Sequence, residues 1–198
     1  MNPLVMFRNL IPLVLAVLLA ACNAQDAAEP PLAGAAIGGP FELVDSSGDT
    51  VRWSDFDGKY RIVYFGYAYC PDVCPFDVQR MMQGYARFKE ENPELAAQVQ
   101  PIFVTIDPER DTPEVVGEFT NAFSDDLIGL TGTPEQVDKA AKAFSVYYAK
   151  GEMSEGGGYL MDHSRSAYLM GRQGEPIALL PADKGAEAVA TELERWVS

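Results

Sequence analysis

Runs of apolar residues alternate with segments of helical periodicity along most of the chain. Residues 61–69 and 99–106 are rich in β-branched and aromatic side chains and predict two central buried strands. Between them, residues 75–89 carry apolar side chains at helical spacing and predict a helix that connects the two strands. A strand–helix–strand unit of this kind is typical of an α/β sheet.

The rest of the chain continues this alternation. Residues 41–53 alternate around the turn Ser47-Gly48-Asp49 and predict an N-terminal β-hairpin. Thr112-Pro113 and Thr133-Pro134 each place a capping residue before a proline, which is typical of a helix start. Further strands are predicted at 126–132, 166–170 and 176–180, and a C-terminal helix at 184–196. We therefore predict one α/β domain with helices on both faces of its sheet.

The first residues have the pattern of a bacterial export signal. Arg8 is the only ionisable side chain before an apolar run that covers residues 10–21. The run is too short to span a membrane comfortably and fits the hydrophobic region of a secretory signal. The sequence LAAC, which ends at Cys22, resembles a lipobox, so we expect residues 1–21 to be a signal peptide and Cys22 to be lipidated. A plain signal peptide or an uncleaved anchor, with Cys22 incidental, is the alternative.

Residues 22–38 are rich in alanine, proline and glycine and lack a periodic apolar pattern, which predicts a flexible tether. The folded domain is then expected at residues 39–198. The lipid would anchor this domain to a membrane outside the cytoplasm, on the periplasmic face. The formal net charge of the chain is −14. Because such an acidic surface repels phosphate backbones, nucleic-acid binding is not expected.

Three cysteines are an awkward number for an exported protein, but lipidation of Cys22 leaves Cys70 and Cys74 as a pair. Both follow the carboxyl end of the first central strand, and open α/β folds build their sites at the carboxyl ends of their strands. Pro71 and Pro75 disfavour helical geometry at the residues before them, so the helix is predicted to begin at Pro75 with Cys74 as its cap. Backbone N–H groups at that end would favour a thiolate at Cys74.

The spacing of the two thiols allows either a disulfide or shared coordination of one metal ion. Two thiolates favour Cu(I), zinc or an iron–sulfur cluster, but zinc and clusters normally need about four protein ligands. The chain has a single histidine, His163, between a glycine-rich segment and the strand predicted at 166–170. A site of Cys70, Cys74 and His163 would suit Cu(I), although the spacing alone does not show that the three residues meet.

Five motifs that occur in order along the chain resemble the Sco/SenC family. They are CPDVCP at 70–75, VTIDPERDTPE at 104–114, FSDDLIGLTGTPEQV at 123–137, VYY at 146–148 and MDHSRSAYLM at 161–170. The resemblance covers residues 38–197 and implies a thioredoxin-like fold with a central mixed sheet. Members of the family are membrane-tethered copper chaperones and thiol reductants that help to assemble the binuclear copper centre of cytochrome c oxidase.

By position, the resemblance makes Cys70, Cys74 and His163 the copper ligands, with one copper ion, Cu(I) or Cu(II), in each domain. It also implies a copper-acceptor protein as partner, namely a cytochrome c oxidase subunit, and other copper chaperones as further partners. Many members are anchored by a transmembrane helix, whereas this chain is expected to use the lipid on Cys22. The resemblance thus implies a metallochaperone rather than an enzyme.

Three other functions fit a pair of cysteines on this fold. A thiol–disulfide oxidoreductase that reduces the cysteines of a copper acceptor is the main alternative, and it would not need His163. A peroxidase would be helped by Thr or Ser three residues before the first cysteine, where this chain has Tyr67. A structural disulfide would close a very short loop and so would stabilise the fold least. Asp107 and Asp111 are expected to order their loop rather than to bind metal.

Overall fold

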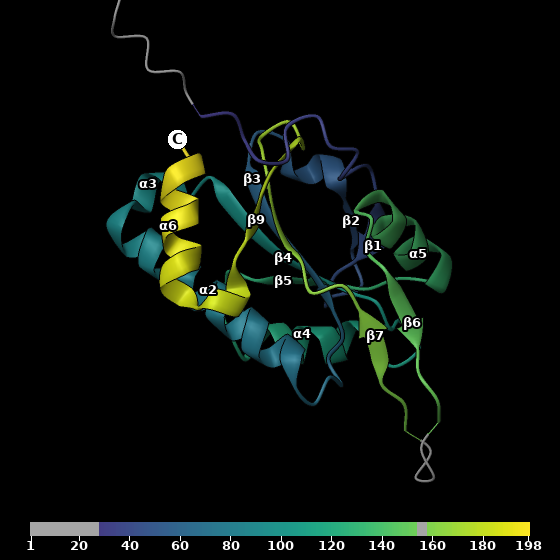
Figure 1. Ribbon diagram of the computed structural model, residues 1–198. Helices are drawn as coiled ribbons and strands as arrows, with labels where there is room; N and C mark the ends of the chain where they lie inside the picture. The colour runs from purple at the N-terminus through teal and green to yellow at the C-terminus, as the bar shows by residue number, and fades with distance from the viewer. Residues whose placement is uncertain (1–27, 154–157) are drawn as a thin grey trace, which may run out of the picture.

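A computed structural model of the protein describes residues 28–153 and 158–198. Its centre is a mixed sheet of five strands in the order β5–β4–β3–β8–β9 (Figure 1). The strands are β3 (Tyr60–Gly66), β4 (Val99–Thr105), β5 (Ile128–Leu130), β8 (Ala167–Met170) and β9 (Pro176–Leu180). β4 runs parallel to β3 and β5, whereas β8 runs antiparallel to both β3 and β9. The mixed sheet that the resemblance implied is therefore confirmed.

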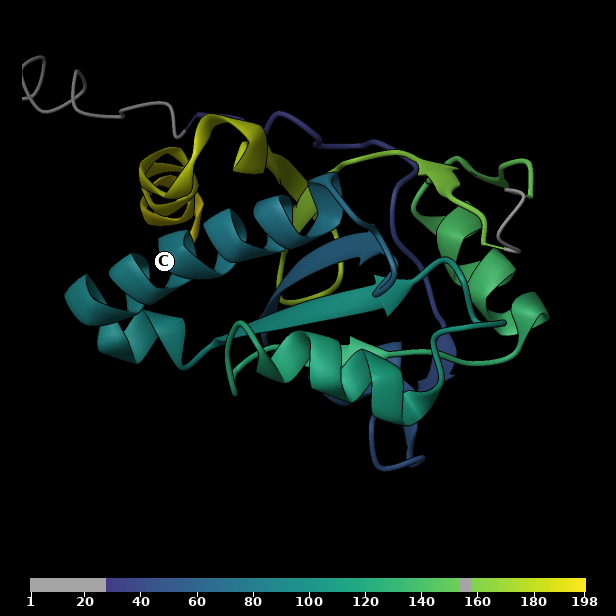
Figure 2. The ribbon, with the colours of Figure 1, turned by 90° about the horizontal axis from the view of Figure 1, so that it is seen from below.

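Helices cover both faces of this sheet. One face carries α2 (Val73–Glu91), α4 (Pro113–Asn121) and α6 (Ala186–Trp196), with α2 between the other two (Figure 2). On this face, Phe103 of β4 packs against Phe119 of α4 with 4.9 Å between ring centroids. On the opposite face, Phe65 of β3 lies 5.3 Å from Phe144, which directly follows α5 (Pro134–Ala143). The predicted covering of both faces is thus confirmed.

The two long helices α2 and α6 approach each other closely at Gly84. A Cβ atom at Gly84 would lie 2.6 Å from the side chain of Val189 and 2.7 Å from the carbonyl oxygen of Ala186. Only a residue without a side chain fits there, so glycine sets the distance between the helices. Behind them, all seven residues of β3 are buried, as expected for a central strand covered on both faces.

The predicted N-terminal hairpin is present as β1 (Glu42–Val44) and β2 (Thr50–Arg52), which pair antiparallel. The carboxylate of Asp45 accepts hydrogen bonds from two backbone N–H groups of the turn. Gly48 completes the turn with a φ of 83°, a left-handed conformation that favours glycine. The hairpin is joined to the end of β5 by a single bridge between Val44 and Thr131.

The hydrophobic core is built by residues from 41 to 197 and lies on both sides of the sheet. The predicted tether, residues 22–38, is described from residue 28 onward, and that part lies against the domain. The backbone N–H of Leu32 donates to β9 at 3.0 Å, and that of Gly38 donates to the last residue of α5 at 2.8 Å. Residues 28–198 therefore contain a complete core and are expected to fold on their own.

A second antiparallel pair, β6 (Tyr148–Lys150) and β7 (Met161–His163), lies beside the central sheet (Figure 1). The sequence did not predict a strand at β7, because three residues are too few to show a period of two. The short helices α3 (Pro93–Ala96), η1 (Trp53–Phe56) and η2 (Ala182–Lys184) were not predicted either.

The predicted signal peptide, residues 1–21, and the predicted lipidation site, Cys22, lie outside the described residues, so both stay predictions. In the part of the chain that the structure describes, no helix is long and apolar enough to cross a membrane.

Candidate metal centre

The two cysteines lie at the carboxyl end of β3, where the chain turns into α2. Cys74 is fully buried in the first turn of α2, and Cys70 is 9% exposed in the loop before it. Both are free thiols, and the backbone N–H of Cys74 donates to the sulfur of Cys70 at 3.4 Å. The loop thus folds the first sulfur back toward the start of the helix, as the sequence led us to expect.

The helix begins earlier than predicted. We expected it to start at Pro75 with Cys74 as the cap, but α2 begins at Val73 and Asp72 precedes it without a side-chain capping bond. Pro75 is then the third helical residue. Since the first N–H groups of a helix have no intrahelical partner, proline is tolerated there and does not fix the helix start.

The pKa of Cys74 also differs from the expectation. Backbone N–H groups were expected to favour the thiolate, but burial raises the pKa of Cys74 above its ordinary value. Hydrogen bonding to Tyr67 acts in the opposite direction and is the weaker effect. Desolvation of the charged form is the largest effect, so the metal-free residue is a neutral thiol at physiological pH.

His163 reaches this pair from β7. Its Nε2 atom lies 3.2 Å from the sulfur of Cys74, and its Nδ1 atom lies 2.8 Å from the carbonyl oxygen of Ser164. Because a carbonyl oxygen only accepts, Nδ1 must carry the proton, which leaves the lone pair of Nε2 directed at Cys74. Burial lowers the pKa of His163, so the ring is neutral at physiological pH. A neutral imidazole with one tethered nitrogen is the form that ligates metals.

The structure therefore brings the three predicted residues to one place, with Cys74 in contact with both of the others. Among the residues that the structure describes, no group of three or more His, Cys, Asp or Glu side chains is placed so that it could hold a metal ion as it stands. Two soft sulfur atoms and one imidazole nitrogen form a donor set that suits copper.

Two tyrosines of the β3 region hold the imidazole, and the sequence analysis did not identify this role. The ring of Tyr67 lies edge-on to His163 at 5.9 Å, and that of Tyr64 lies edge-on at 6.5 Å. The hydroxyl of Tyr67 also accepts the backbone N–H of Met161, the first residue of β7. Tyr67 thus fixes the strand that carries His163 to the strand that leads to the cysteines.

An ion pair between Asp77 and Arg165 is a second connection that the sequence analysis missed. The carboxylate of Asp77 accepts two hydrogen bonds from Arg165, at 2.9 and 2.8 Å, and one from the hydroxyl of Tyr64 at 3.1 Å. Asp77 is one helical turn after Cys74, and Arg165 is two residues after His163. The sequence did contain a signal for this pair, because Asp77 is a carboxylate three residues after Cys74 on the helix face that is expected to be buried.

The loop after β4 ties both sides of the site together. Asp111 is buried and its carboxylate accepts the backbone N–H of Ala68 at 2.9 Å, two residues before Cys70. Asp107 accepts the hydroxyl of Tyr159 at 2.7 Å and forms an ion pair with Arg110. Tyr159 leads into β7. The expectation that both aspartates order this loop is confirmed.

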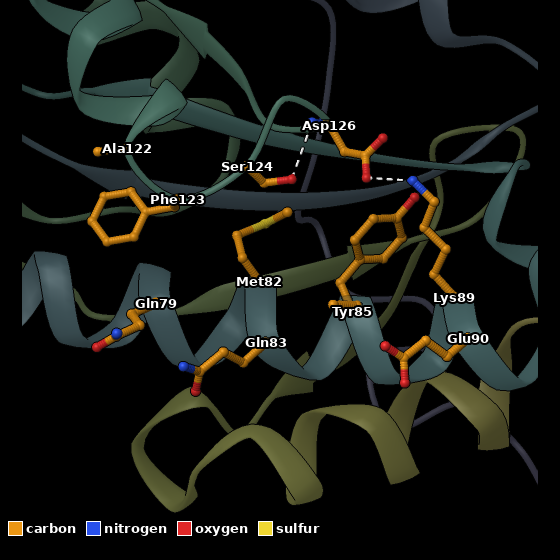
Figure 3. Close-up of a pocket in the computed structure, with 11 residues that line it drawn as sticks. Gln79, Met82, Gln83, Tyr85, Lys89, Glu90, Ala122, Phe123, Ser124 and Asp126 are labelled. Carbon is orange, nitrogen blue, oxygen red and sulfur yellow. Dashed lines mark hydrogen bonds and ion pairs between the residues drawn. The ribbon is translucent and has the colours of Figure 1, made fainter.

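A separate groove of about 510 Å³ lies between α2 and the chain that follows α4 (Figure 3). Its apolar floor includes Met82 and Phe123, and the ion pair between Lys89 and Asp126 lies at one end. No thiol or imidazole lines this groove, so it is not part of the candidate metal centre.

The chain is similar in sequence to known proteins. The chain is 46% identical over 138 residues to protein SenC of Rhodobacter capsulatus, and the aligned part makes up 70% of this chain and 60% of that protein. It is 36% identical over 157 residues to the mitochondrial SCO1 homolog of Homo sapiens, and the aligned part makes up 79% of this chain and 52% of that protein. The chain spans about half the length of the curated relatives it matches.

The fold agrees as well. The structure of Bradyrhizobium japonicum ScoI with copper bound superposes with a TM-score of 0.72 at 34% identity, over 81% of this chain and 99% of that one. Yeast Sco1 with copper bound gives a TM-score of 0.73 at 32% identity, over 81% and 88% of the two chains. The expected thioredoxin-like fold is confirmed. The sequence model of the SCO1/SenC family matches residues 29–198, and this chain therefore belongs to the SCO1/SenC family.

Proposed function

We propose that this chain is a copper metallochaperone that holds one copper ion through Cys70, Cys74 and His163. The observation that carries the proposal is the contact of 3.2 Å between Nε2 of His163 and the sulfur of Cys74, with Nδ1 of the same ring tied to a backbone carbonyl. This contact joins residues 89 positions apart in sequence, and it supports their joint role as ligands of one metal ion. Relatives described with copper bound support the choice of metal.

The chemistry of the donors favours copper that can be taken up and released. Thiolates and imidazole bind Cu(I) strongly, and three donors satisfy it, whereas Cu(II) would require a further oxygen or nitrogen donor. Since both cysteines must lose their protons to bind, copper loading releases protons. The raised pKa of Cys74 makes proton release harder, so protons compete with copper at this sulfur.

The partner and the location are part of the same proposal. The copper acceptor is a cytochrome c oxidase subunit that receives the metal while its copper centre is assembled, and other copper chaperones supply the ion. The domain is held at the periplasmic face of a membrane by a lipid on Cys22, the residue that follows the signal peptide of residues 1–21. The LAAC sequence supports the lipid anchor, and membership of the SCO1/SenC family supports the acceptor.

Copper binding by the chain from residue 28 onward tests the proposal. Cu(I) is titrated anaerobically against a competing chelator with wild type, Cys70→Ser, Cys74→Ser and His163→Ala. We expect one equivalent to bind, with affinity reduced roughly 100-fold or more in each of the three variants. Asp162→Asn, which changes an exposed carboxylate beside His163, serves as the matched control and should bind as wild type does. Binding that is indifferent to His163→Ala would overturn the three-ligand site.

A second function, thiol–disulfide exchange, is favoured by the proximity of Cys70 to the first turn of α2, where Cys74 lies. In this reaction the two thiols form one disulfide, and their two electrons and two protons pass to a disulfide of the acceptor. The reaction does not require imidazole. Reduction of an oxidised acceptor that persists in His163→Ala, but is lost in Cys70→Ser, would assign this activity to the chain.

A further inference from the structure

Most of the exposed large apolar side chains of the described residues belong to the segments that carry the candidate metal ligands. In the part of the chain that the structure describes, six such side chains are exposed, and five of them lie within residues 69–76, 147–153 or 158–160. We define these five as the apolar rim: Tyr69, Phe76, Tyr147, Met153 and Leu160. Each is more than half exposed, and the sixth, Leu179, lies on the edge strand β9.

The rim residues come from the two segments that also carry the ligands. Tyr69 directly precedes Cys70, and Phe76 follows Cys74 by two residues. The other three belong to the β6–β7 region, whose last residue is His163. The segments that carry the candidate ligands therefore also carry most of the exposed apolar surface of the described residues.

Two of the rim residues, Tyr69 and Leu160, line a groove of about 540 Å³. Tyr69 forms one wall, and Tyr159 and Leu160 form the other. The guanidinium of Arg110 lies between the walls, 3.6 Å from the ring centroid of Tyr159 and 5.3 Å from that of Tyr69. Stacking on a planar cation restrains the aromatic walls, so the groove is formed before any partner arrives.

Transfer of a metal ion from this site requires close contact. Cys74 is fully buried and Cys70 is 9% exposed, so an incoming ligand atom must approach along the Cys70 side, next to Tyr69. A protein that brings a sulfur atom to this point necessarily covers the surface around it. Exposed apolar patches that are rimmed by polar groups mark interaction sites, and aromatic side chains commonly contribute most of the binding energy.

We propose that the apolar rim is the docking surface for the copper-acceptor protein, which presents Cys or Met ligands within an apolar face that is not acidic. This proposal rests on the proposed function and names the recognition chemistry of its partner. A second copy of this chain is disfavoured as occupant, because two chains with a formal net charge of −14 each would repel one another. An acceptor of neutral or basic charge meets no such barrier.

The test compares Phe76→Ser/Leu160→Ser with Leu179→Ser, a matched exposed apolar residue outside the rim. The probe is the reduced, copper-free soluble domain of the cytochrome c oxidase subunit that carries the binuclear copper centre. Its binding to the reduced, copper-free chain from residue 28 onward is measured by calorimetry. We expect the double variant to bind at least about 10-fold more weakly than wild type, and Leu179→Ser to bind as wild type does.

The Cu(I) affinity of the same proteins separates this proposal from the proposed function. It should be unchanged in the double variant, because neither substituted side chain is a ligand. If wild type did not bind Cu(I), the copper site would be overturned. The calorimetric binding of the copper-free proteins would still test whether the apolar rim is a docking surface. Absence of acceptor binding in wild type, or equal affinity in wild type and the double variant, would overturn the docking surface. Sedimentation that shows a wild-type dimer which the double variant abolishes would assign the rim to a second copy and overturn the proposed occupant.

Discussion

Removal of the Asp77 carboxylate should destabilise the domain strongly, because this group is almost fully buried and serves two elements. Asp77 is 1% exposed, and it accepts hydrogen bonds from Arg165 and from the hydroxyl of Tyr64. In Asp77→Ala the Tyr64 hydroxyl keeps its buried position and loses its charged partner. Arg165, whose side chain is 45% exposed, can turn toward water.

The magnitude follows from these two losses. A buried hydrogen bond to a charged group contributes about 1.5–3 kcal/mol. The ion pair with a half-exposed arginine adds only ~0–1 kcal/mol, because solvent screens it. Asp77→Ala should therefore lower the free energy of unfolding by roughly 2–4 kcal/mol, which corresponds to a Tm about 5–15 °C lower for a domain of this size.

Urea unfolding under reducing conditions measures the effect. Tyr64→Phe removes the hydroxyl but leaves the ion pair in place, so its effect should be the smaller of the two. Asp162→Asn changes an exposed carboxylate and should alter stability by less than ~0.5 kcal/mol. If Asp77→Ala changed the free energy of unfolding by less than ~1 kcal/mol, the buried pair would not hold α2 to the β7–β8 connection as described.

Three further predictions concern packing, capping and pH. Gly84→Ala should destabilise the domain by about 1–3 kcal/mol because its Cβ forces α2 away from α6, whereas Gln83→Ala on the exposed side of α2 should not; thermal unfolding compares them. Thr133→Ala removes the side chain that caps α5 and should cost about 0.5–2 kcal/mol in urea unfolding, with Lys139→Ala as the neutral control. Burial raises the pKa of Asp111 in the folded state, so the stability that its protonated form contributes is present below pH 3.8 and is lost as pH rises through the folded-state pKa. Over that interval the free energy of unfolding of wild type should fall relative to that of Asp111→Asn. A difference between the two proteins that stays constant from acid to neutral pH would contradict this.

The sheet and its main helices could be predicted because their signals are local. β3 and β4 are long apolar runs, and α4 and α5 begin at Thr-Pro pairs whose threonine hydroxyls cap the helices in the structure. The turn residues Ser47-Gly48-Asp49 predicted the N-terminal hairpin correctly. These features depend on neighbouring residues, and neighbouring residues are what a sequence pattern records.

The features that were missed depend on contacts between distant segments. β7 is a strand only because it pairs with β6 across the glycine-rich segment. The pKa of Cys74 depends on how much protein covers it. The position at a helix N-terminus predicted a lowered pKa, whereas burial raises it. The role of Tyr67 could not be read from its neighbours, since its partner Met161 is 94 residues away.

The candidate site was identified by composition and motif rather than by geometry. A single histidine and two cysteines in one loop left few other donors, and the family motifs placed His163 beside them. The ion pair of Asp77 and Arg165 was not predicted because its two residues are 88 positions apart in sequence. Only the fold shows that the side chain of Asp77 is buried and pairs with Arg165.

The ligand set of bound copper tests the central claim most directly. X-ray absorption at the copper edge of the Cu(I)-loaded chain should show two sulfur donors and one nitrogen donor, and the nitrogen contribution should disappear in His163→Ala. A copper environment that lacks nitrogen in wild type, or one that His163→Ala leaves unchanged, would contradict a site built from Cys70, Cys74 and His163.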